Sequence, residues 1–168
     1  MGLDLAADIA TAAKGGAWAA FLNAGQVCTS AERFYVHRSV YDEFVSEFVA
    51  YTESLRLGDP LAATTDIGPM VSAPQRDKVV AQVEAAVAGG AEVVTGGGRG
   101  GQATGHFFAP AVVTGAPAST DLLREETFGP VAPIVPVASL DEAVELANGL
   151  RFGLGVNVYT RDLGTTVR

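Results

Sequence analysis

The sequence is short of cysteine, histidine and basic side chains, and each shortage excludes a class of structure or partner. Its single cysteine cannot form a disulfide within the chain, which suits a reducing compartment, so a cytoplasmic location is expected. The two histidines, His37 and His106, lie far apart without cysteine or acidic residues at ligand spacing, so we expect no metal site. Eleven basic residues stand against 19 acidic ones, and the net charge of −8 argues against nucleic acid as a partner.

Long hydrophobic runs are also missing. The first residues lack a basic segment followed by an apolar one, and no stretch of roughly 18 uninterrupted apolar residues follows. We therefore expect no membrane partner. Hydrophobic residues nevertheless make up 48% of the 168-residue chain, which is enough to form the core of one domain.

Helix N-termini are indicated at three serines, each followed three residues later by an acid or an amide. We expect Gly89, in a left-handed conformation, to end the second of these helices and Gly149 to end the third. A further helix is expected over residues 5–21, although its two central glycines lower its propensity. The serine pairs are Ser39 with Asp42, Ser72 with Gln75, and Ser139 with Glu142.

Short apolar runs between these helices are typical of strands. Helices and strands alternate along the sequence. The strand-like runs are also too apolar for a sheet with one solvent-exposed face, and both observations favour a mainly parallel sheet. We therefore predict an α/β, three-layer domain with helices on both faces of the sheet, and we expect Trp18, Phe44 and Phe48 in its core. The expected strands are residues 33–37, 92–95, 107–114, 131–137 and 155–159.

A glycine-rich run at residues 96–101 has the spacing of a dinucleotide-binding fingerprint, and Asp121 follows about 20 residues later. In that fingerprint a helix N-terminus points at the pyrophosphate. Here the run leads into an apolar, strand-like segment instead. We interpret it as a hairpin-like tip.

Cys28 lies in the run NAGQVCTS (residues 23–30), a glycine-containing connection between an expected helix and an expected strand. Reactive groups are often placed on such loops. A lone cysteine is more often a small buried apolar residue, however, and a nucleophile needs a lowered pKa or a nearby base. From these residues alone, both alternatives stay open.

Two short sequence motifs, called phrases below, resemble motifs of NAD(P)-dependent aldehyde dehydrogenases. The run at residues 23–30 is similar to the active-site cysteine signature, and EETFGPV at residues 125–131 is similar to the family's glutamate-x-phenylalanine-glycine-proline pattern. Weaker similar stretches at residues 57–60, 67–69 and 105–110 extend the resemblance over essentially the whole chain. The matching residues are Asn23, Gly25, Gln26 and Cys28 in the first phrase, and Glu126, Phe128, Gly129 and Pro130 in the second.

The resemblance implies a reaction and roles for three residues. Cys28 attacks the carbonyl of a small-molecule aldehyde to give a thiohemiacetal, a hydride passes to the nicotinamide of NAD or NADP, and water releases the acid from a thioester. The backbone N–H of Cys28 helps to hold the oxyanion. Glu126 binds the hydroxyls of the nicotinamide ribose, and Phe128 packs beside that end of the cofactor. Without the resemblance, Glu125 and Glu126 would be a solvated charge pair and Phe128 a core residue.

Several parts of the family's enzyme have no counterpart in the sequence. The N-terminal dinucleotide-binding domain is absent, and so is its terminal glutamate-leucine-glycine-glycine-lysine phrase, which holds the usual general base. Glu32 and Glu43 do not match that base, and Asn23, which does not match the family's oxyanion-binding asparagine, is assigned a structural role. We expect residues 1–168 to be a nucleophile-bearing segment of the catalytic domain that is inactive alone, with family-like homo-oligomers only for a full-length chain.

Two readings of the function are left open. The first is aldehyde oxidation in a full-length protein, and the second is a non-enzymatic, thiol-bearing module that associates with a longer homologous subunit through exposed apolar surfaces. Residues 31–33 and Thr127 resemble family members that act on hydroxyaldehydes such as lactaldehyde or glycolaldehyde. Betaine aldehyde and semialdehydes remain alternatives, because pocket walls outside this segment contribute to substrate choice.

Overall fold

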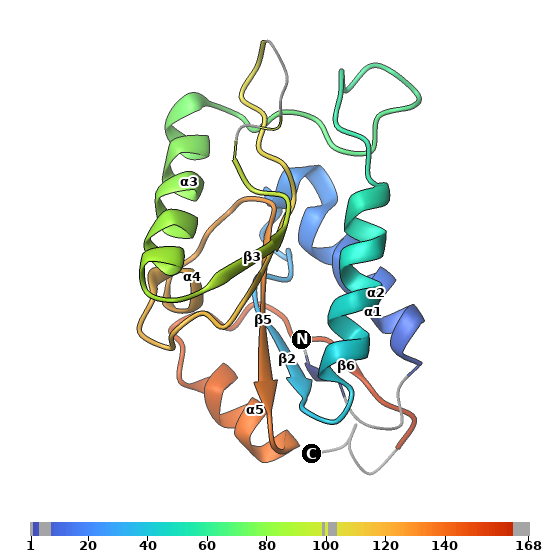
Figure 1. Cartoon of the computed structure of the whole chain (residues 1–168), viewed down its shortest axis with the longest axis vertical. Coiled ribbons are helices and arrows are strands. Elements are labelled where there is room, and N and C mark those ends of the chain that lie inside the picture. The colour runs from blue at the N-terminus through green and yellow to red at the C-terminus, as the bar shows by residue number, and fades with distance from the viewer. Residues whose placement is uncertain (1, 4–7, 99, 101–103, 163–168) are drawn as a thin grey trace.

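The computed structural model describes residues 2–3, 8–98, 100 and 104–162, which form an α/β domain around one sheet (Figure 1). The sheet order is β3-β4-β5-β2-β1-β6, and all neighbouring strands are parallel except the antiparallel pair β3 and β4. The predicted mainly parallel sheet is therefore confirmed. The strands are β1 (Gly2–Leu3), β2 (Phe34–His37), β3 (Glu92–Thr95), β4 (Ala111–Thr114), β5 (Val131–Val137) and β6 (Val158–Tyr159).

Helices cover both faces of the sheet, as predicted (Figure 1). Helices α1 (Ile9–Phe21) and α2 (Tyr41–Ser54) lie on one face. Helices α3 (Ala73–Ala88), α4 (Asp121–Arg124) and α5 (Leu140–Asn148) lie on the other. None of the helices in the described part of the chain is both long and apolar enough to cross a membrane.

Aromatic side chains fill the core between α1, α2 and β2. Phe48 is fully buried and makes edge contacts with Phe34 and Phe21, at 5.1 and 5.9 Å between ring centroids. The expectation that Trp18 belongs to this core is wrong, since 59% of its surface is exposed. The buried stripe of α1 consists of small residues spaced three and four apart, ending at Phe21, and Trp18 falls outside that stripe.

The helix ends follow the predictions in part. Ser72 and Ser139 cap α3 and α5, with their hydroxyls accepting from N–H groups three residues on, at 3.3 and 3.2 Å. Ser39 does not cap α2, because its hydroxyl is hydrogen-bonded to His37 Nδ1 at 2.8 Å, and Val40 occupies the cap position instead. Gly89 is not left-handed, since its φ is −81°. The left-handed residue is the next one, Gly90.

Gly15 within α1 has a packing contact that helix propensity does not reveal. A Cβ on Gly15 would lie 2.5 Å from the hydroxyl of Tyr159 on β6. A side chain at this position would force the Tyr159 ring to move, so glycine lets the ring pack directly on the helix backbone. The helix begins at Ile9 with Asp8 as its cap, and the earlier residues of the expected range, 5–7, lie outside the described residues.

Residues 96–98 of the glycine-rich run pair back with the segment that precedes β4, as a hairpin-like tip predicts. Gly96, Gly97 and Gly98 all have positive φ, and hydrogen bonds pair Gly97 and Gly98 with Ala109 across the tip. Residues 99 and 101–103 lie outside the described residues. The expected strand over residues 107–114 is shorter than predicted, because its first four residues accompany this tip and only Ala111–Thr114 joins β5. Strand β1 and helix α4 were too short to be predicted.

The loop after α2 is held by an exposed ion pair between Arg56 and Asp66, whose Nε and Oδ2 atoms are 2.7 Å apart. Hydrogen bonds from the side chain and backbone of Arg56 lower the pKa of Asp66 from 3.8 to about 2. The charged carboxylate therefore stabilises the folded protein above pH 3.8, and this contribution is lost as the pH falls through about 2.

We expect Asp66 to remain ionised at pH 3, and carboxyl-carbon NMR of the folded protein measures this directly. Arg56→Met is the control, because removing the guanidinium should return the pKa of Asp66 towards 3.8. A midpoint near 3.8 in the unchanged protein would show that the ion pair does not form in solution.

Candidate active site

Cys28 lies on a turn that follows helix α1. The chain leaves the helix through Leu22–Gly25 (η1), in which Asn23, Ala24 and Gly25 have φ values of 52°, 55° and 69°. The N–H of Ser30 then donates to Val27 O over 2.9 Å, which puts Cys28 near the apex of the turn. The thiol side chain is exposed within the described chain. The alternative of a small buried cysteine is therefore wrong for this domain.

Polar side chains fasten the turn on both sides of Cys28. Ser30 Oγ lies 3.0 and 3.1 Å from the carbonyl oxygens of Ala19 and Ala20 at the end of α1, and it donates its one proton there. Gln26 Oε1 accepts from the N–H of Val71 over 2.9 Å. Asn23 Nδ2 donates to Gln26 O over 3.1 Å, within its own turn, which agrees with a structural role. Sequence reasoning gave no such role to Ser30.

The two phrases of the sequence meet at a pair of glycines. A Cβ on Gly25 would overlap the carbonyl oxygen and carbon of Gly129, so the backbones of the Cys28 turn and of the second phrase are in direct contact. Only glycine allows this approach. More than 100 residues of sequence separate the two positions, and the fold brings them together.

Glu126 and Phe128 lie on a loop between α4 and β5. The side chain of Glu126 is exposed, and no hydrogen bond or ion pair engages its carboxylate among the described residues. Phe128 is half-buried and has a φ of 51°, a conformation that a bulky residue adopts only when its surroundings hold it there. Thr127 between them is 1% exposed. The loop thus presents one carboxylate outward and anchors itself through its neighbours.

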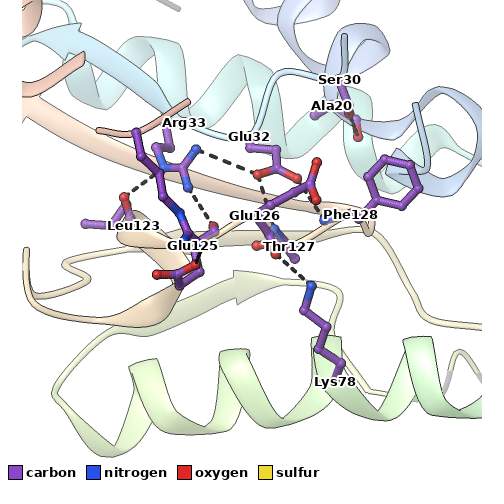
Figure 2. A network of polar contacts seen from close by, with 11 residues as sticks. Ala20, Ser30, Glu32, Arg33, Lys78, Leu123, Glu125, Glu126, Thr127 and Phe128 are labelled. Atoms are coloured by element: carbon purple, nitrogen blue, oxygen red, sulfur yellow. Dashed lines mark hydrogen bonds and ion pairs between the residues drawn. The ribbon is translucent and has the colours of Figure 1, made fainter. Parts of the chain in front are cut away.

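Helix α3 holds this loop through two side chains that sequence reasoning missed. Gln75 Nε2 donates to the carbonyl oxygens of Thr127 and Phe128, at 3.1 and 2.9 Å. Lys78 Nζ donates to the carbonyl oxygen of Glu126 over 2.8 Å (Figure 2). The sequence showed Gln75 only as the partner of a helix-capping serine, and it gave no signal for Lys78.

Arg33 holds the start of the same loop from the other side. Its Nε and Nη2 atoms donate to the carbonyl oxygens of Leu123 and Glu125, at 2.8 and 2.6 Å (Figure 2). Its guanidinium also lies 5.6 Å from the ring centroid of Phe152. The side chain of Arg33 is only 10% exposed. This buried cation therefore serves the loop backbone and does not offer a free charge to a ligand.

Glu32 is occupied in a similar way. Its Oε1 accepts from the N–H of Phe128 over 2.8 Å, and its Oε2 accepts from the N–H of Thr127 over 3.2 Å (Figure 2). Both carboxylate oxygens are thus engaged with the loop. This geometry agrees with the expectation that Glu32 is not the general base.

A groove of about 470 Å³ lies between α3 and the loop that carries Glu126. Gln82 contributes to its wall and is only 9% exposed, yet its Oε1 has no hydrogen-bond partner among the described residues. An ion pair between Arg151 and Glu125 lies at the groove as well. The ribose of a nicotinamide cofactor carries hydroxyl donors, and the exposed carboxylate of Glu126 at this groove is an acceptor for such donors. The residues present therefore fit the end of such a cofactor.

No cluster of three or more histidine, cysteine, aspartate or glutamate residues suited to a metal occurs in the described part of the chain. The ring of His37 instead bonds Ser39 and, through Nε2, the carbonyl oxygen of Ala138 at 2.9 Å. The described residues form an α/β domain with an exposed thiol on a turn. This turn contacts a loop whose Glu126 carboxylate is exposed and has no partner among these residues.

Comparison with known proteins identifies the family. The family model described as "Aldehyde dehydrogenase family" matches residues 3–168. The chain belongs to the aldehyde dehydrogenase family, as the two phrases predicted. It is 45% identical over 159 residues to succinate-semialdehyde dehydrogenase [NADP(+)] 1 of Mycobacterium tuberculosis, and 43% identical to the corresponding enzyme of Mycobacterium leprae. Each match covers 95% of this chain and 34% of the relative, so the chain spans about a third of the length of these curated relatives.

Solved structures agree with this assignment and with the fold. The succinate-semialdehyde dehydrogenase of Burkholderia pseudomallei superposes with a TM-score of 0.94 at 38% identity, covering 99% of this chain and 34% of that one. An NAD-dependent aldehyde dehydrogenase of Sinorhizobium meliloti superposes with a TM-score of 0.95 at 36% identity, covering 99% and 33%. The predicted α/β fold of the family's catalytic domain is confirmed.

Proposed function

We propose that Cys28 is the nucleophile in an NAD(P)-dependent oxidation of an aldehyde to a carboxylic acid, carried out by the whole protein to which residues 1–168 belong. The observation that carries the proposal is the contact between Gly25 and Gly129. It places the turn that carries Cys28 against the loop that carries Glu126, so that the proposed nucleophile and the proposed cofactor-binding carboxylate lie on two segments in backbone contact.

The chemistry at Cys28 divides one oxidation into two steps. The thiolate forms a bond to the carbonyl carbon, which gives a thiohemiacetal with its negative charge on oxygen, near the backbone N–H of Cys28. NAD or NADP, when bound, would supply the oxidant by accepting the hydride that this carbon loses. Cys28 is then left as a thioester, and water breaks the carbon–sulfur bond to release the acid and the thiol.

The loop residues position the cofactor in this proposal. Glu126 accepts hydrogen bonds from the hydroxyls of the nicotinamide ribose, two acceptor oxygens matching two donors. Phe128 packs beside that end of the cofactor. Support comes from the exposed carboxylate of Glu126, which lies at the groove and has no hydrogen-bond or ion-pair partner among the described residues.

The base that activates the hydrolytic water is proposed to lie outside residues 1–168. Glu32 is engaged by two amides, and Glu43 lies on the exposed side of α2. We propose accordingly that these residues form the nucleophile-bearing part of the catalytic domain and are inactive alone. The names of the relatives favour a semialdehyde such as succinate semialdehyde as substrate over the hydroxyaldehydes that the short phrases suggested.

A non-enzymatic role remains a second candidate because apolar side chains are exposed on the domain. They include Trp18 and Leu22 on and just after α1, and Leu154 and Val156 before β6. In this second candidate, a longer homologous subunit packs against these exposed apolar side chains of the thiol-bearing module. The two candidates differ in whether Cys28 becomes acylated.

Rapid mixing of the whole protein with aldehyde and NAD(P), followed by acid quenching, tests the proposed function. We expect a burst of reduced cofactor and a peptide containing Cys28 that is heavier by the acyl group of the aldehyde. Succinate semialdehyde and lactaldehyde are the two substrates to compare. A protein that turns over aldehyde while Cys28 stays unmodified would exclude the mechanism, and a protein with neither burst nor adduct would favour the module.

The same experiment tests the proposed cofactor-binding role of Glu126. We expect Glu126→Gln to form the acyl adduct roughly 10–100-fold more slowly, because the amide accepts at one atom only and the nicotinamide is misplaced. Glu84→Gln, an exposed change on α3, is the matched control and should react at the normal rate. An unchanged burst rate in Glu126→Gln would remove this residue from the cofactor site.

A further inference from the structure

The loop between α4 and β5, which carries Glu126 and Phe128, is called the cofactor loop here. The carboxylate of Glu32 binds two consecutive backbone amides of this loop. Phe128 N–H donates to Oε1 over 2.8 Å and Thr127 N–H donates to Oε2 over 3.2 Å (Figure 2). The side chain of Glu32 is 13% exposed, so water competes little for either oxygen. Hydrogen bonds to a charged acceptor are stronger than neutral ones, and one carboxylate can serve both donors only in one orientation.

These bonds act at a strained point of the backbone. Phe128 has a φ of 51°, and its amide is held by Glu32 while its carbonyl is held by Gln75. A bulky residue returns to negative φ unless its neighbours prevent this. Such a change would rotate the peptide units that carry Glu126 and Phe128, so the hydrogen bonds to the backbone determine where both side chains point.

Glu32 also belongs to the segment that carries the nucleophile. It follows Cys28 by four residues, and the intervening Ser30 is fixed to the carbonyls of Ala19 and Ala20 at the end of α1. A short and anchored stretch of chain therefore links the thiol of Cys28 to the carboxylate that binds the loop of Glu126. The Gly25–Gly129 contact joins the same two segments a second time.

Two other roles for Glu32 fit the contacts less well. A general base needs a carboxylate oxygen open to water, whereas both oxygens of Glu32 are engaged by amides. An ion-pair role would depend on Arg33, but the atoms lie 3.7 Å apart and Arg33 directs its Nε and Nη2 to the carbonyls of Leu123 and Glu125. The closer contacts of Glu32 are those with the loop.

We infer that Glu32 is a positioning residue for the proposed oxidation, fixing Glu126 and Phe128 relative to Cys28 by holding the Thr127 and Phe128 amides. This inference rests on the proposed function for its catalytic consequence. Glu32 touches neither substrate nor cofactor, and it acts through the geometry of the loop.

Glu32→Gln in the whole protein tests the inference. The glutamine keeps the size of the side chain but has one acceptor oxygen, and its amide group faces the second N–H. We expect hydride transfer to slow about 10-fold, with an increased kinetic isotope effect for the aldehyde deuterated at its carbonyl carbon, because a displaced cofactor makes this step limiting. We also expect the Thr127 and Phe128 amides to exchange with solvent at least about 10-fold faster in the cofactor-free protein.

Glu43→Gln is the matched control, because Glu43 is an exposed glutamate on α2. It should change neither the isotope effect nor the exchange of the two amides. If Glu32→Ala does not fold, Glu32→Gln still tests the positioning role, because the glutamine preserves the side-chain volume and one hydrogen bond.

The possible results separate the two proposals. Faster amide exchange together with a raised isotope effect supports the positioning role. Faster exchange with an unchanged isotope effect and rate per folded molecule would show that Glu32 is merely structural, and unchanged exchange would show that it does not hold the loop; both overturn the inference. Failure of the proposed function would instead appear as an unmodified Cys28 in the acid-quenched wild-type protein.

Discussion

Replacing Cys28 by alanine is expected to abolish aldehyde oxidation while leaving the fold intact. The side chain is exposed and the thiol has no packing role in the described chain, so the change should cost little stability. The proposed nucleophile, in contrast, has no substitute within residues 1–168, which hold one cysteine. Loss of a covalent nucleophile lowers turnover by on the order of 10⁴-fold or more.

Pre-steady-state formation of reduced cofactor in the whole protein measures this effect. Cys28→Ala should give no burst and no acyl adduct, with an unchanged thermal midpoint. Thr29→Ala, an exposed change at the neighbouring position of the same turn, is the control and should retain the burst. A normal burst from the Cys28→Ala protein would refute the nucleophile assignment.

Replacing Gly25 by alanine is expected to damage the site through the backbone. The new Cβ would overlap the carbonyl of Gly129, and alanine would also be forced into φ +69°. Left-handed φ alone costs an alanine about 1–2 kcal/mol. Displacement of a packed backbone segment adds about 1–3 kcal/mol, so we expect a total loss of about 2–5 kcal/mol in the free energy of unfolding.

Gly98→Ala separates the two contributions. Gly98 has nearly the same φ, +71°, but a Cβ there meets nothing within 4 Å. Urea unfolding of both variants should show about 1–2 kcal/mol for Gly98→Ala and a clearly larger loss for Gly25→Ala. Equal losses would mean that the Cys28 turn and the Gly129 backbone are not in contact in solution.

The sequence was sufficient for the layers of the fold and for the two phrases of the site. Ser72 and Ser139 were recognisable as caps because a cap is a local interaction over three residues. Strand β5 was recognisable because its apolar run is continuous. Trp18 was misplaced because an aromatic residue at helical spacing looks like core until the position of the buried alanine stripe is known.

The side chains that assemble the site were not predictable in the same way. Glu32 and Arg33 bond to residues between 90 and 96 positions away, and Gln75 and Lys78 to residues 48 to 53 positions away. No local pattern encodes such pairs, because their partners are backbone atoms that every residue type offers. Gly15 likewise gives no sign of its contact with Tyr159 until α1 and β6 are in place.

The hydrogen bonds that hold the loop between α4 and β5 also determine when the candidate site can form during synthesis of the chain. Cys28, Glu32 and Arg33 leave the ribosome long before residues 123–128, whose backbone they need. Closing a loop of this length is among the slower events of folding. The early thiol therefore passes through a period in which its turn lacks these neighbours, and the arrangement around Cys28 is complete only after β5 has joined the sheet beside β2.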